Sequence, residues 1–321
     1  MKLPDLAAAR RTWYDARRTR LTNEIARMAE SLPPDPPPAE RSIDPRNSLN
    51  DMTGREWLYA LGSVLATRYP TKGAEGYAHA LRRAHPSPKP PQLMADLIRF
   101  FTKAGGRVLD PFAGVGGTLL ACAMEGRQGV GVELSPEYAA IYAQACAELG
   151  LAQQALIIGD ARRLAEYAEV AQAPFDLLLT DPPYAQMMAR PKTGERKKQG
   201  RGDATPFTID AADLGNLEYP AFLAALREVL ATGLAYLKPH GYLVLFCKDM
   251  QPTRAHHNML HADIVEELLK LPNLSYRGYR IWHDMSQNFY PFGYPFTFVA
   301  NQVHQFILIF RKEDQLANDL T

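Results

Sequence analysis

The sequence predicts an α/β fold: a mixed seven-stranded sheet with helices on both faces, an antiparallel C-terminal hairpin and a helical N-terminal extension. Three observations support this prediction. Short apolar runs alternate with amphipathic segments between residues 107 and 249, as in a parallel sheet with crossover helices. Two β-rich runs flank Asn301 and Gln302, which is typical of a hairpin. Residues 1–84 instead indicate helices interrupted by prolines.

The N-terminal part of the chain is predicted to be helical. Residues 31–45 contain a proline-rich run, which favours an extended linker. Asn50 and Asp51 are candidate caps for the helix that follows them. Apolar residues recur at helical spacing before a glycine at position 105. The expected helices span residues 1–30, 55–69 and 92–105.

The alternating part of the chain supplies the sheet and its covering helices. Strands are expected at 107–112, 129–134, 155–160, 175–181 and 241–249. Helices are expected at 116–126, 136–150, 161–171 and 219–237. The hairpin is expected at 297–310. This domain is therefore assigned to residues 85–312, after the extension at 1–84 and before a tail at 313–321.

Composition excludes several classes of protein. Of 321 residues, 46% are hydrophobic and 22% are charged, a balance that can bury a sizeable core. No apolar run reaches the roughly 18–20 residues of a membrane span, and the N-terminus lacks the apolar core of a secretory signal. Cys122, Cys146 and Cys247 form no CxxC pair, which disfavours a disulfide framework or a zinc site. We therefore expect a soluble cytoplasmic protein.

Two further sequence patterns concern metal binding and nucleic-acid binding. His257 and His261 have helical i,i+4 spacing but lack a third ligand, so we expect surface histidines and no metal. The net charge of +1 does not by itself indicate a polyanion partner. Residues 190–203, however, carry six Lys or Arg against two acids. This segment either binds the phosphate backbone of a nucleic acid or is simply a solvated loop. We assign residues 185–216 to a basic mobile loop.

Acidic residues end the predicted strands near a glycine-rich turn. The turn DPFAGVGGT begins at Asp110, and its glycines permit close approach of the backbone to a ligand. A carboxylate directly before the turn would repel a pyrophosphate, so a ligand with a positive charge and an amino-acid head fits better. Glu133 stands about twenty residues after the glycines, where a carboxylate binds ribose hydroxyls, and Asp160 ends the next strand, where an acid could accept from an adenine amino group.

The stretch TDPPYAQ follows the apolar run FDLLL, and its two prolines cannot continue a central parallel strand. Asp181-Pro182-Pro183-Tyr184 therefore forms a rigid turn at the carboxyl edge of the sheet, where ligands bind in open α/β folds. This turn presents a carboxylate, an aromatic ring and backbone carbonyls.

Five motifs together resemble those of the exocyclic-amino DNA methyltransferases, which make N6-methyladenine or N4-methylcytosine: HPSPKP, DPFAGVGGT, VGVEL, GDARRL and TDPPY. The resemblance covers residues 85–312 and implies a Rossmann-like class I methyltransferase fold with S-adenosylmethionine as cofactor. The cofactor half precedes DPPY here, a departure from the commoner order that should leave the site unaffected. The cofactor-binding residues that the turn chemistry and the resemblance imply are His85, Ser87, Lys89, Asp110, Phe112, Ala113, Gly114, Gly116, Thr118, Glu133, Leu134, Asp160 and Ala161.

The chemistry implied for the DPPY turn is the activation of a poor nucleophile. The lone pair of a base's exocyclic amine is delocalised, and Asp181 with the carbonyl of Pro182 can accept both N–H hydrogens as the charge develops. Pro183 has no N–H that competes for these acceptors, and Tyr184 can stack on a base that has been flipped out of the duplex. None of the cysteines follows a proline, as a cytosine-C5 nucleophile would.

Contacts to DNA are expected from the basic loop and from an aromatic segment. NFYPFGYPFTF has six aromatics in eleven residues, which suits either core packing or the wall of a base pocket. Sequence readout is expected from the basic loop and from residues 251–290, through the major groove. The predicted DNA or base contacts are Phe289, Tyr290, Phe292, Lys192, Arg196, Lys197, Lys198 and Arg201.

Several functional alternatives remain open at the level of sequence. Aspartate in the first position of DPPY is usual for adenine-N6 enzymes in this family, so adenine is favoured over cytosine N4. An RNA guanine-N2 methyltransferase shares a similar turn but tends to carry an RNA-binding domain, which residues 1–84 do not resemble. A catalytically dead nucleic-acid-binding module would have lost the acid of DPPY, and a nucleotide oxidoreductase explains neither DPPY nor HPSPKP. The expected partner is double-stranded DNA in the nucleoid, with a cognate restriction endonuclease as a further candidate.

Overall fold

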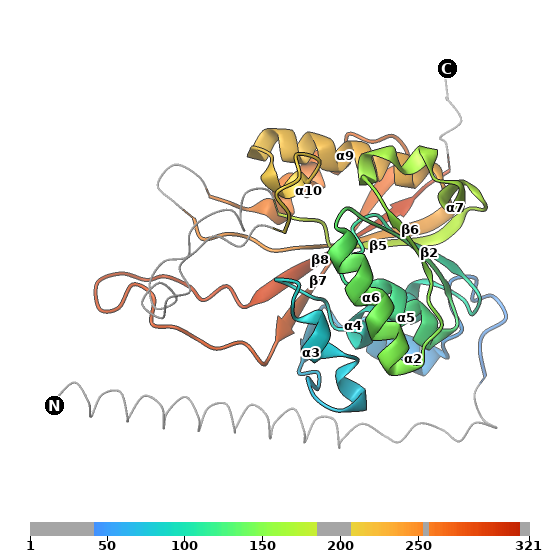
Figure 1. Ribbon diagram of the computed structural model, residues 1–321, viewed down its shortest axis with the longest axis horizontal. Coiled ribbons are helices and arrows are strands. Elements are labelled where there is room, and N and C mark those ends of the chain that lie inside the picture. Colours follow the sequence, from blue (N-terminus) through green and yellow to red (C-terminus); the bar gives the residue numbers. More distant parts are fainter. Residues whose placement is uncertain (1–41, 185–206, 253–256, 315–321) are drawn as a thin grey trace. The chain divides into compact units, whose positions relative to one another are not determined.

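A computed structural model describes residues 42–184, 207–252 and 257–314 of the chain (Figure 1). The elements below lie in the compact unit Asp44–Thr321. The strands are β1 (Val64–Thr67), β2 (Arg107–Asp110), β3 (Gln128–Glu133), β4 (Ala155–Ile158), β5 (Phe175–Thr180), β6 (Leu237–Cys247), β7 (Leu274–Asp284) and β8 (His304–Lys312). The α-helices are α2 (Gly54–Ala60), α3 (His79–Arg82), α4 (Pro91–Phe101), α5 (Gly117–Glu125), α6 (Pro136–Leu149), α7 (Ala168–Ala171), α9 (Tyr219–Ala235) and α10 (Leu260–Leu268). The 3₁₀ helices are η2 (Ala74–Gly76), η3 (Ala161–Glu166) and η5 (Leu214–Asn216).

The strands form one mixed sheet in the order β1-β7-β8-β6-β5-β2-β3-β4. Strand β8 pairs antiparallel with both β6 and β7, whereas the remaining pairs are parallel. Because all the parallel strands point the same way, the residues after β2, β3, β4 and β5 meet at one carboxyl edge. This edge carries the acidic motifs of the sequence. The predicted α/β class with an antiparallel C-terminal pair is confirmed.

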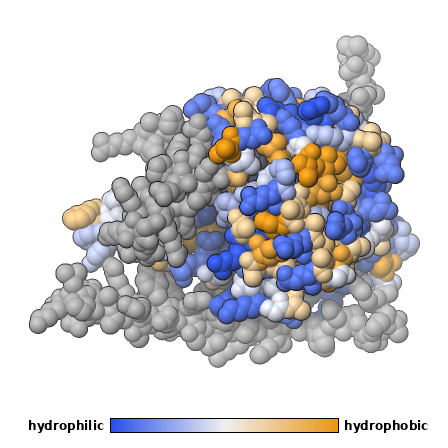
Figure 2. All heavy atoms as spheres, in the orientation of Figure 1, coloured by the Kyte–Doolittle hydropathy of each residue, from blue (hydrophilic) through white to orange (hydrophobic). Residues whose placement is uncertain are grey.

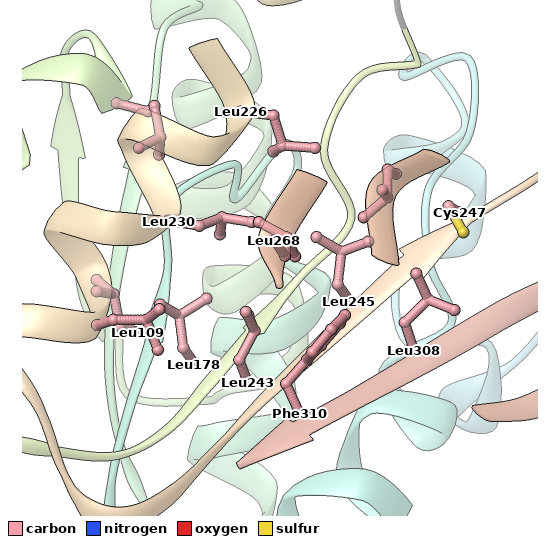
Figure 3. Close-up of a cluster of buried hydrophobic side chains, with 14 of the residues drawn as sticks. Leu109, Leu178, Leu226, Leu230, Leu243, Leu245, Cys247, Leu268, Leu308 and Phe310 are labelled. Carbon is pink, nitrogen blue, oxygen red and sulfur yellow. The ribbon is translucent and has the colours of Figure 1, made fainter. Parts of the chain in front are cut away.

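Alternation along the strands divides the core into two layers. In β5, Leu177 and Leu179 pack with helix α4, while Leu178 packs on the opposite face with helix α9. Strand β6 alternates in the same way. Figure 3 shows the core layer between the sheet and helices α9 and α10, which is built mainly from leucines. Helices on both faces thus fix the strand ends that carry the site.

The sheet has eight strands, so the prediction of seven was wrong. The additional strand β1 lies within residues 55–69, which were expected to form a single helix. Helix α2 ends at Ala60 because Gly62 and a short apolar run follow, and this run pairs parallel with β7. The cap of α2 is Thr53, in a capping box with Glu56, and not Asn50 or Asp51. The Asn50 side chain instead donates to the carbonyl of Phe100, at 2.7 Å.

The antiparallel pair also differs from the predicted hairpin at 297–310. Strand β8 pairs with β7, and the long connection 285–303 joins them. Residues 297–300 have no strand partner. Within the region 251–290, expected to read DNA sequence, Leu260, Ile264, Leu268, Leu274 and Trp282 are buried, and the other described residues are partly or fully exposed. The expected helix 161–171 is the 3₁₀ helix η3 followed by the short helix α7.

The surface of the described residues mixes polar and apolar side chains. On the face that Figure 2 shows, hydrophilic and hydrophobic residues are interspersed. None of the helices in the described segments is long and apolar enough to cross a membrane. The expected helix 1–30, most of the linker and the basic stretch 190–203 lie outside the described residues.

Candidate active site

Asp110 lies at the end of β2 and connects three elements. Its buried carboxylate accepts hydrogen bonds from the Thr118 hydroxyl at 2.6 Å, the Thr180 hydroxyl at 2.7 Å and the backbone N–H of Phe112 at 3.1 Å. Burial raises the pKa of Asp110 to about 6, although these three donors act to lower it. The carboxylate therefore joins β2 to the start of α5 and to the end of β5, next to the DPPY turn.

The glycine turn brings the backbone close to the pocket. Gly114 and Gly116 have φ values of 53° and 75°, in the left-handed region that favours glycine. A Cβ on Gly116 would lie 2.0 Å from the ring of Tyr142 on α6. Gly116 does not line the pocket, so its role in this structure is close packing of α5 against α6. The other predicted cofactor residues all line the pocket.

Glu133 ends β3 and faces the glycine turn. Its carboxylate accepts from the backbone N–H groups of Gly114 at 2.8 Å and Ser135 at 2.7 Å. Burial raises the pKa of Glu133 to about 7, and the neighbouring charges of Asp110 and Asp213 act in the same direction. Glu133 is therefore a fixed acceptor at the edge of the pocket, in the position expected for an acid that binds ribose hydroxyls.

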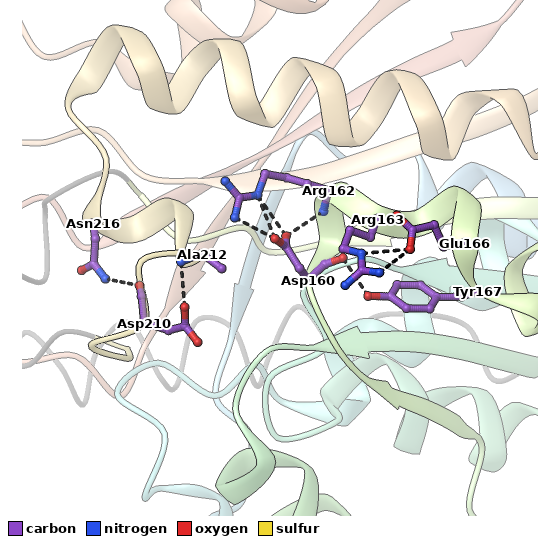
Figure 4. A network of polar contacts seen from close by, with 8 residues as sticks. All are labelled: Asp160, Arg162, Arg163, Glu166, Tyr167, Asp210, Ala212 and Asn216. Atoms are coloured by element: carbon purple, nitrogen blue, oxygen red, sulfur yellow. Dashed lines mark hydrogen bonds and ion pairs between the residues drawn. The ribbon is translucent and has the colours of Figure 1, made fainter.

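Asp160 ends the next strand but is already paired. It caps η3 and accepts several hydrogen bonds from Arg162, including one of 2.7 Å from the guanidinium (Figure 4). Partial burial acts to raise the pKa of Asp160, but the hydrogen bonds from Arg162 outweigh it, so the pKa lies below its ordinary value. Asp160 lines the pocket, yet an adenine amino group would have to share this carboxylate with Arg162.

The HPSPKP segment closes the other side of the pocket. His85 accepts from the backbone N–H of Ser87 at 3.2 Å and stacks on Phe207, with ring centroids 5.1 Å apart. Burial lowers the pKa of His85 to about 3, and the charges of Lys89 and Arg82 add to this effect, so the imidazole is neutral. Arg82, which is buried, donates to the carbonyls of Val115 and Lys89. Arg82 thereby holds the HPSPKP segment against the glycine turn.

The DPPY turn lies at the same pocket, with Asp181 and Pro183 in its lining. The Tyr184 hydroxyl donates to one carboxylate oxygen of Asp181, and the Lys89 ammonium pairs with the other. The ring of Tyr184 is only 5% exposed and belongs to the core, so in this structure it positions Asp181 and presents no face for stacking. Pro182 is also buried.

Sequence reasoning missed several pocket residues that carry no motif. Phe207, Thr208, Asp213 and Leu214 line the pocket, so the C-terminal part of the predicted mobile loop 185–216 belongs to the site. The buried Asp213 accepts from Thr208 and from the backbone of Gly215, at 3.0 and 2.8 Å respectively. The Tyr138 hydroxyl on α6 donates to the carbonyl of Phe207 at 3.0 Å. The only sequence signal for this turn is an aspartate two residues before a glycine.

The aromatic segment between β7 and β8 is largely exposed. Phe289 and Phe292 are 52% and 45% exposed, and Tyr290 is partly buried. Phe296 and Phe298, which were not singled out, are 92% and 90% exposed. The connection leaves the carboxyl edge of the sheet because β8 runs against β6. The open question of core or surface is therefore resolved in favour of surface for most of these rings.

Two sequence predictions remain: the basic residues that would contact DNA, and the surface histidines, of which His261 is partly buried. The basic residues Lys192, Arg196, Lys197, Lys198 and Arg201 lie outside the described residues. His261 pairs with Asp249 at 2.8 Å and stacks on Phe306. In the described segments no group of three His, Cys, Asp or Glu side chains is arranged to hold a metal ion.

Two family models match parts of the chain: "DNA methylase" over residues 26–144 and "Conserved hypothetical protein 95" over residues 96–198. The methylase YubD of Escherichia coli (strain K12) is 35% identical over 82 residues, which cover 26% of this chain and 36% of that protein. The type II methyltransferase M.XycI of Xanthomonas campestris pv. cyanopsidis is 47% identical over 60 residues, 19% of this chain and 20% of that protein.

A longer match, to the release factor glutamine methyltransferase of Rhodospirillum rubrum, has 28% identity over 154 residues, 44% of this chain and 46% of that protein. The chain thus spans less than half the length of each of these three relatives. Among solved structures, an rRNA methylase from Streptococcus thermophilus has a TM-score of 0.42 at 12% identity, covering 71% of this chain and 99% of that chain. On its motifs and on the matches to the DNA methylase model over residues 26–144 and to the type II methyltransferase, this part of the chain is similar to the exocyclic-amino DNA methylases.

Proposed function

We propose that this protein transfers a methyl group from S-adenosylmethionine to the exocyclic amino group of a base in double-stranded DNA, with N6 of adenine favoured and N4 of cytosine as the alternative. The observation that carries this proposal is the position of Asp181. It lies at the carboxyl edge of the sheet, in the wall of the same pocket as Asp110 and Glu133. A methyl acceptor held by Asp181 would therefore adjoin a ligand held by these acids.

The pocket residues fit this cofactor. Glu133 can accept from ribose hydroxyls, and the glycine turn gives the ligand close access to the backbone. His85, Ser87 and Lys89 line the same pocket, and the family resemblance implies that they contact the methionine end of the cofactor. When bound, the cofactor supplies an electrophilic methyl group on a positively charged sulfur. The acids of the pocket suit that positive charge, since Lys89 and Arg82 are the only lysine and arginine in the described lining.

The chain's own residues then activate the amine. Asp181 accepts one N–H of the amine and the backbone carbonyl of Pro182 accepts the other, which offsets the positive charge that develops on nitrogen. Tyr184 holds Asp181 in place through its hydroxyl. The base must leave the duplex first, at a cost of a few kcal/mol. Because Tyr184 is buried, we assign the stacking of the flipped base to the exposed rings, Phe289 and Phe292 foremost.

Two features support DNA as the substrate. The basic loop follows the catalytic turn in the sequence, and the aromatic connection 285–303 begins at the same edge of the sheet. The basic residues that would contact phosphates are Lys192, Arg196, Lys197, Lys198 and Arg201. The candidates for sequence readout are residues 248–252, 257–259 and 285–303, together with the exposed residues of the predicted region 251–290. A cognate restriction endonuclease and a nucleoid location stay predictions.

The test is mass spectrometry of nucleosides from plasmid DNA, and separately from bulk RNA, after incubation with the protein and labelled S-adenosylmethionine. The Asp181→Ala variant serves as the matched control for contaminating activity. N6-methyladenosine in the DNA supports the favoured reading, and N4-methylcytosine supports its alternative. Label found only in RNA as N2-methylguanosine would overturn the proposal in favour of an RNA guanine-N2 enzyme.

A further inference from the structure

Asp181 has both of its carboxylate oxygens engaged. Oδ1 accepts from the hydroxyl of Tyr184, and Oδ2 pairs with the ammonium of Lys89. The side chains of Lys89 and Asp181 are 5% and 15% exposed, so solvent does little to screen their pairing. In the proposed function this carboxylate must accept an N–H of the target amine. A carboxylate can accept more than two hydrogen bonds, but the positive charge of Lys89 opposes the positive charge that develops on the amine, so we expect one partner of Asp181 to give way.

Lys89 is the partner that can move. Tyr184 follows Asp181 in the same proline-bearing turn, and its ring is packed in the core. Lys89 is fixed at its backbone, where its carbonyl accepts from Arg82 at 2.6 Å. Its ammonium, in contrast, ends a flexible four-carbon stem. The side chain can therefore swing while the HPSPKP segment stays in place.

The pocket restricts what can draw Lys89 away. Its ammonium lies 5.2 Å from the ring centroid of Phe246 and has Asp181 as its ion-pair partner among the described residues. Separating a buried pair leaves two uncompensated charges, which is strongly unfavourable. The separation becomes favourable when a new anion reaches Lys89 or a new cation reaches Asp181. A ligand with an amino-acid carboxylate and a sulfonium carries both charges.

We propose that Lys89 is a positioning residue that gates Asp181, and that cofactor binding releases the carboxylate to the target amine. This proposal rests on the proposed function and adds a coupling between its two substrates. Lys89 as a simple cofactor contact would change the affinity for the cofactor alone. Lys89 as a gate makes cofactor and DNA strengthen each other's binding, because such a coupling is reciprocal.

The experiment compares the wild type with Lys89→Met, which removes the charge, and Lys89→Arg, which keeps it. Lys103→Met, at an exposed lysine just after α4 and outside the pocket, is the matched control. Methyl transfer by the wild type to plasmid DNA is measured first. If no transfer occurs, both the proposed function and the gating role of Lys89 are refuted. An unmethylated DNA fragment that contains the site methylated in that plasmid is then prepared. The affinity of each protein for this fragment is measured by fluorescence anisotropy at high salt, which suppresses non-specific binding.

Anisotropy is recorded with no cofactor and with saturating sinefungin, an analogue with an amine cation in place of the sulfonium and no methyl to transfer. The wild type, Lys89→Arg and Lys103→Met should bind the fragment about tenfold more tightly with sinefungin, within the usual range of coupling. Lys89→Met should gain less than about twofold and should bind more tightly than the wild type when no analogue is present. Lys89→Gln repeats the comparison if Lys89→Met does not fold.

Two results would overturn the gate while leaving the proposed function intact. One is a wild type that methylates DNA but binds it equally well with and without sinefungin. The other is a Lys89→Met or Lys89→Gln variant whose affinity without the analogue equals that of the wild type. The second comparison needs no ligand in the pocket, so a variant that binds the cofactor poorly still decides the question.

Discussion

The pH dependence of cofactor binding provides a direct test of the role of Glu133. This side chain is buried at the end of β3, and burial is the main cause that raises its pKa to about 7. Binding of ribose hydroxyls requires the ionised form as a double acceptor. The pKa of this acid is raised, so the carboxyl is protonated on the acid side of pH 7. Cofactor affinity is therefore expected to fall as the pH decreases through 7.

The size of the effect follows from the fraction ionised. One pH unit below a pKa of about 7, about a tenth of the Glu133 carboxyls are ionised, and one unit above it most are. The dissociation constant at pH 6 should be about tenfold larger than at pH 8, or about 1.4 kcal/mol in binding free energy. Asp110, with a pKa of about 6, is about half protonated at the acid end of this window and ionised over the rest of it, and His85, with a pKa of about 3, stays neutral throughout.

The assay is isothermal titration calorimetry with S-adenosylhomocysteine, which is not turned over, at pH values from 6 to 8. Glu133→Gln keeps the shape of the side chain and should bind more weakly but with little pH dependence. Glu137→Gln, at an exposed glutamate at the start of α6, should behave like the wild type. A wild type with constant affinity over this range, or a Glu133→Gln variant with the same slope as the wild type, would refute the role assigned to Glu133.

Three further predictions concern catalysis, packing and DNA binding. Asp181→Ala should abolish methyl transfer while calorimetry shows near-normal cofactor affinity, and a variant with ordinary turnover would contradict the mechanism. Gly116→Ala places a Cβ against an aromatic ring at a left-handed backbone position, so urea unfolding should reveal a loss of about 2–5 kcal/mol; an unchanged midpoint would refute the packing role. Neutralising Lys197, Lys198 and Arg201 should weaken DNA binding and reduce the slope of log affinity against log salt by up to about 2.7; an unaltered slope would make the loop a bystander.

The sequence predicted the central part of the fold well because its signals there are local. Apolar runs with glycine or proline boundaries identified β2 to β6, and helix α9 lies within the predicted range. Strand β1 escaped prediction because four residues between two loops carry little periodicity, and their strand character depends on pairing with β7. The partner of β8 was misplaced for the same reason. A polar-interrupted strand such as β7 is defined by its neighbours and not by its own pattern.

The candidate site was predictable where residue chemistry and position coincide. Asp110, Glu133 and Asp181 follow strands, so their meeting at one edge follows from the parallel sheet. The pairing of Lys89 with Asp181 was not predictable, because it depends on side-chain directions from segments 92 residues apart. The inward packing of Tyr184 was equally hidden, since a tyrosine after two prolines suits either a stacking surface or a hydrogen bond.

Strand β1 also has a consequence for how the chain acquires its structure. The Trp282 indole on β7 donates to the Thr67 hydroxyl on β1 at 2.9 Å, a contact that spans 215 residues. Pairing over so long a loop is slow, so we expect this edge of the sheet to form late in folding. A fragment that began at residue 85 would leave the edge of β7 unpaired, and such an edge is a template for aggregation. Strand β1 is the first of the described strands to be synthesised, and we expect it to be among the last to join the sheet.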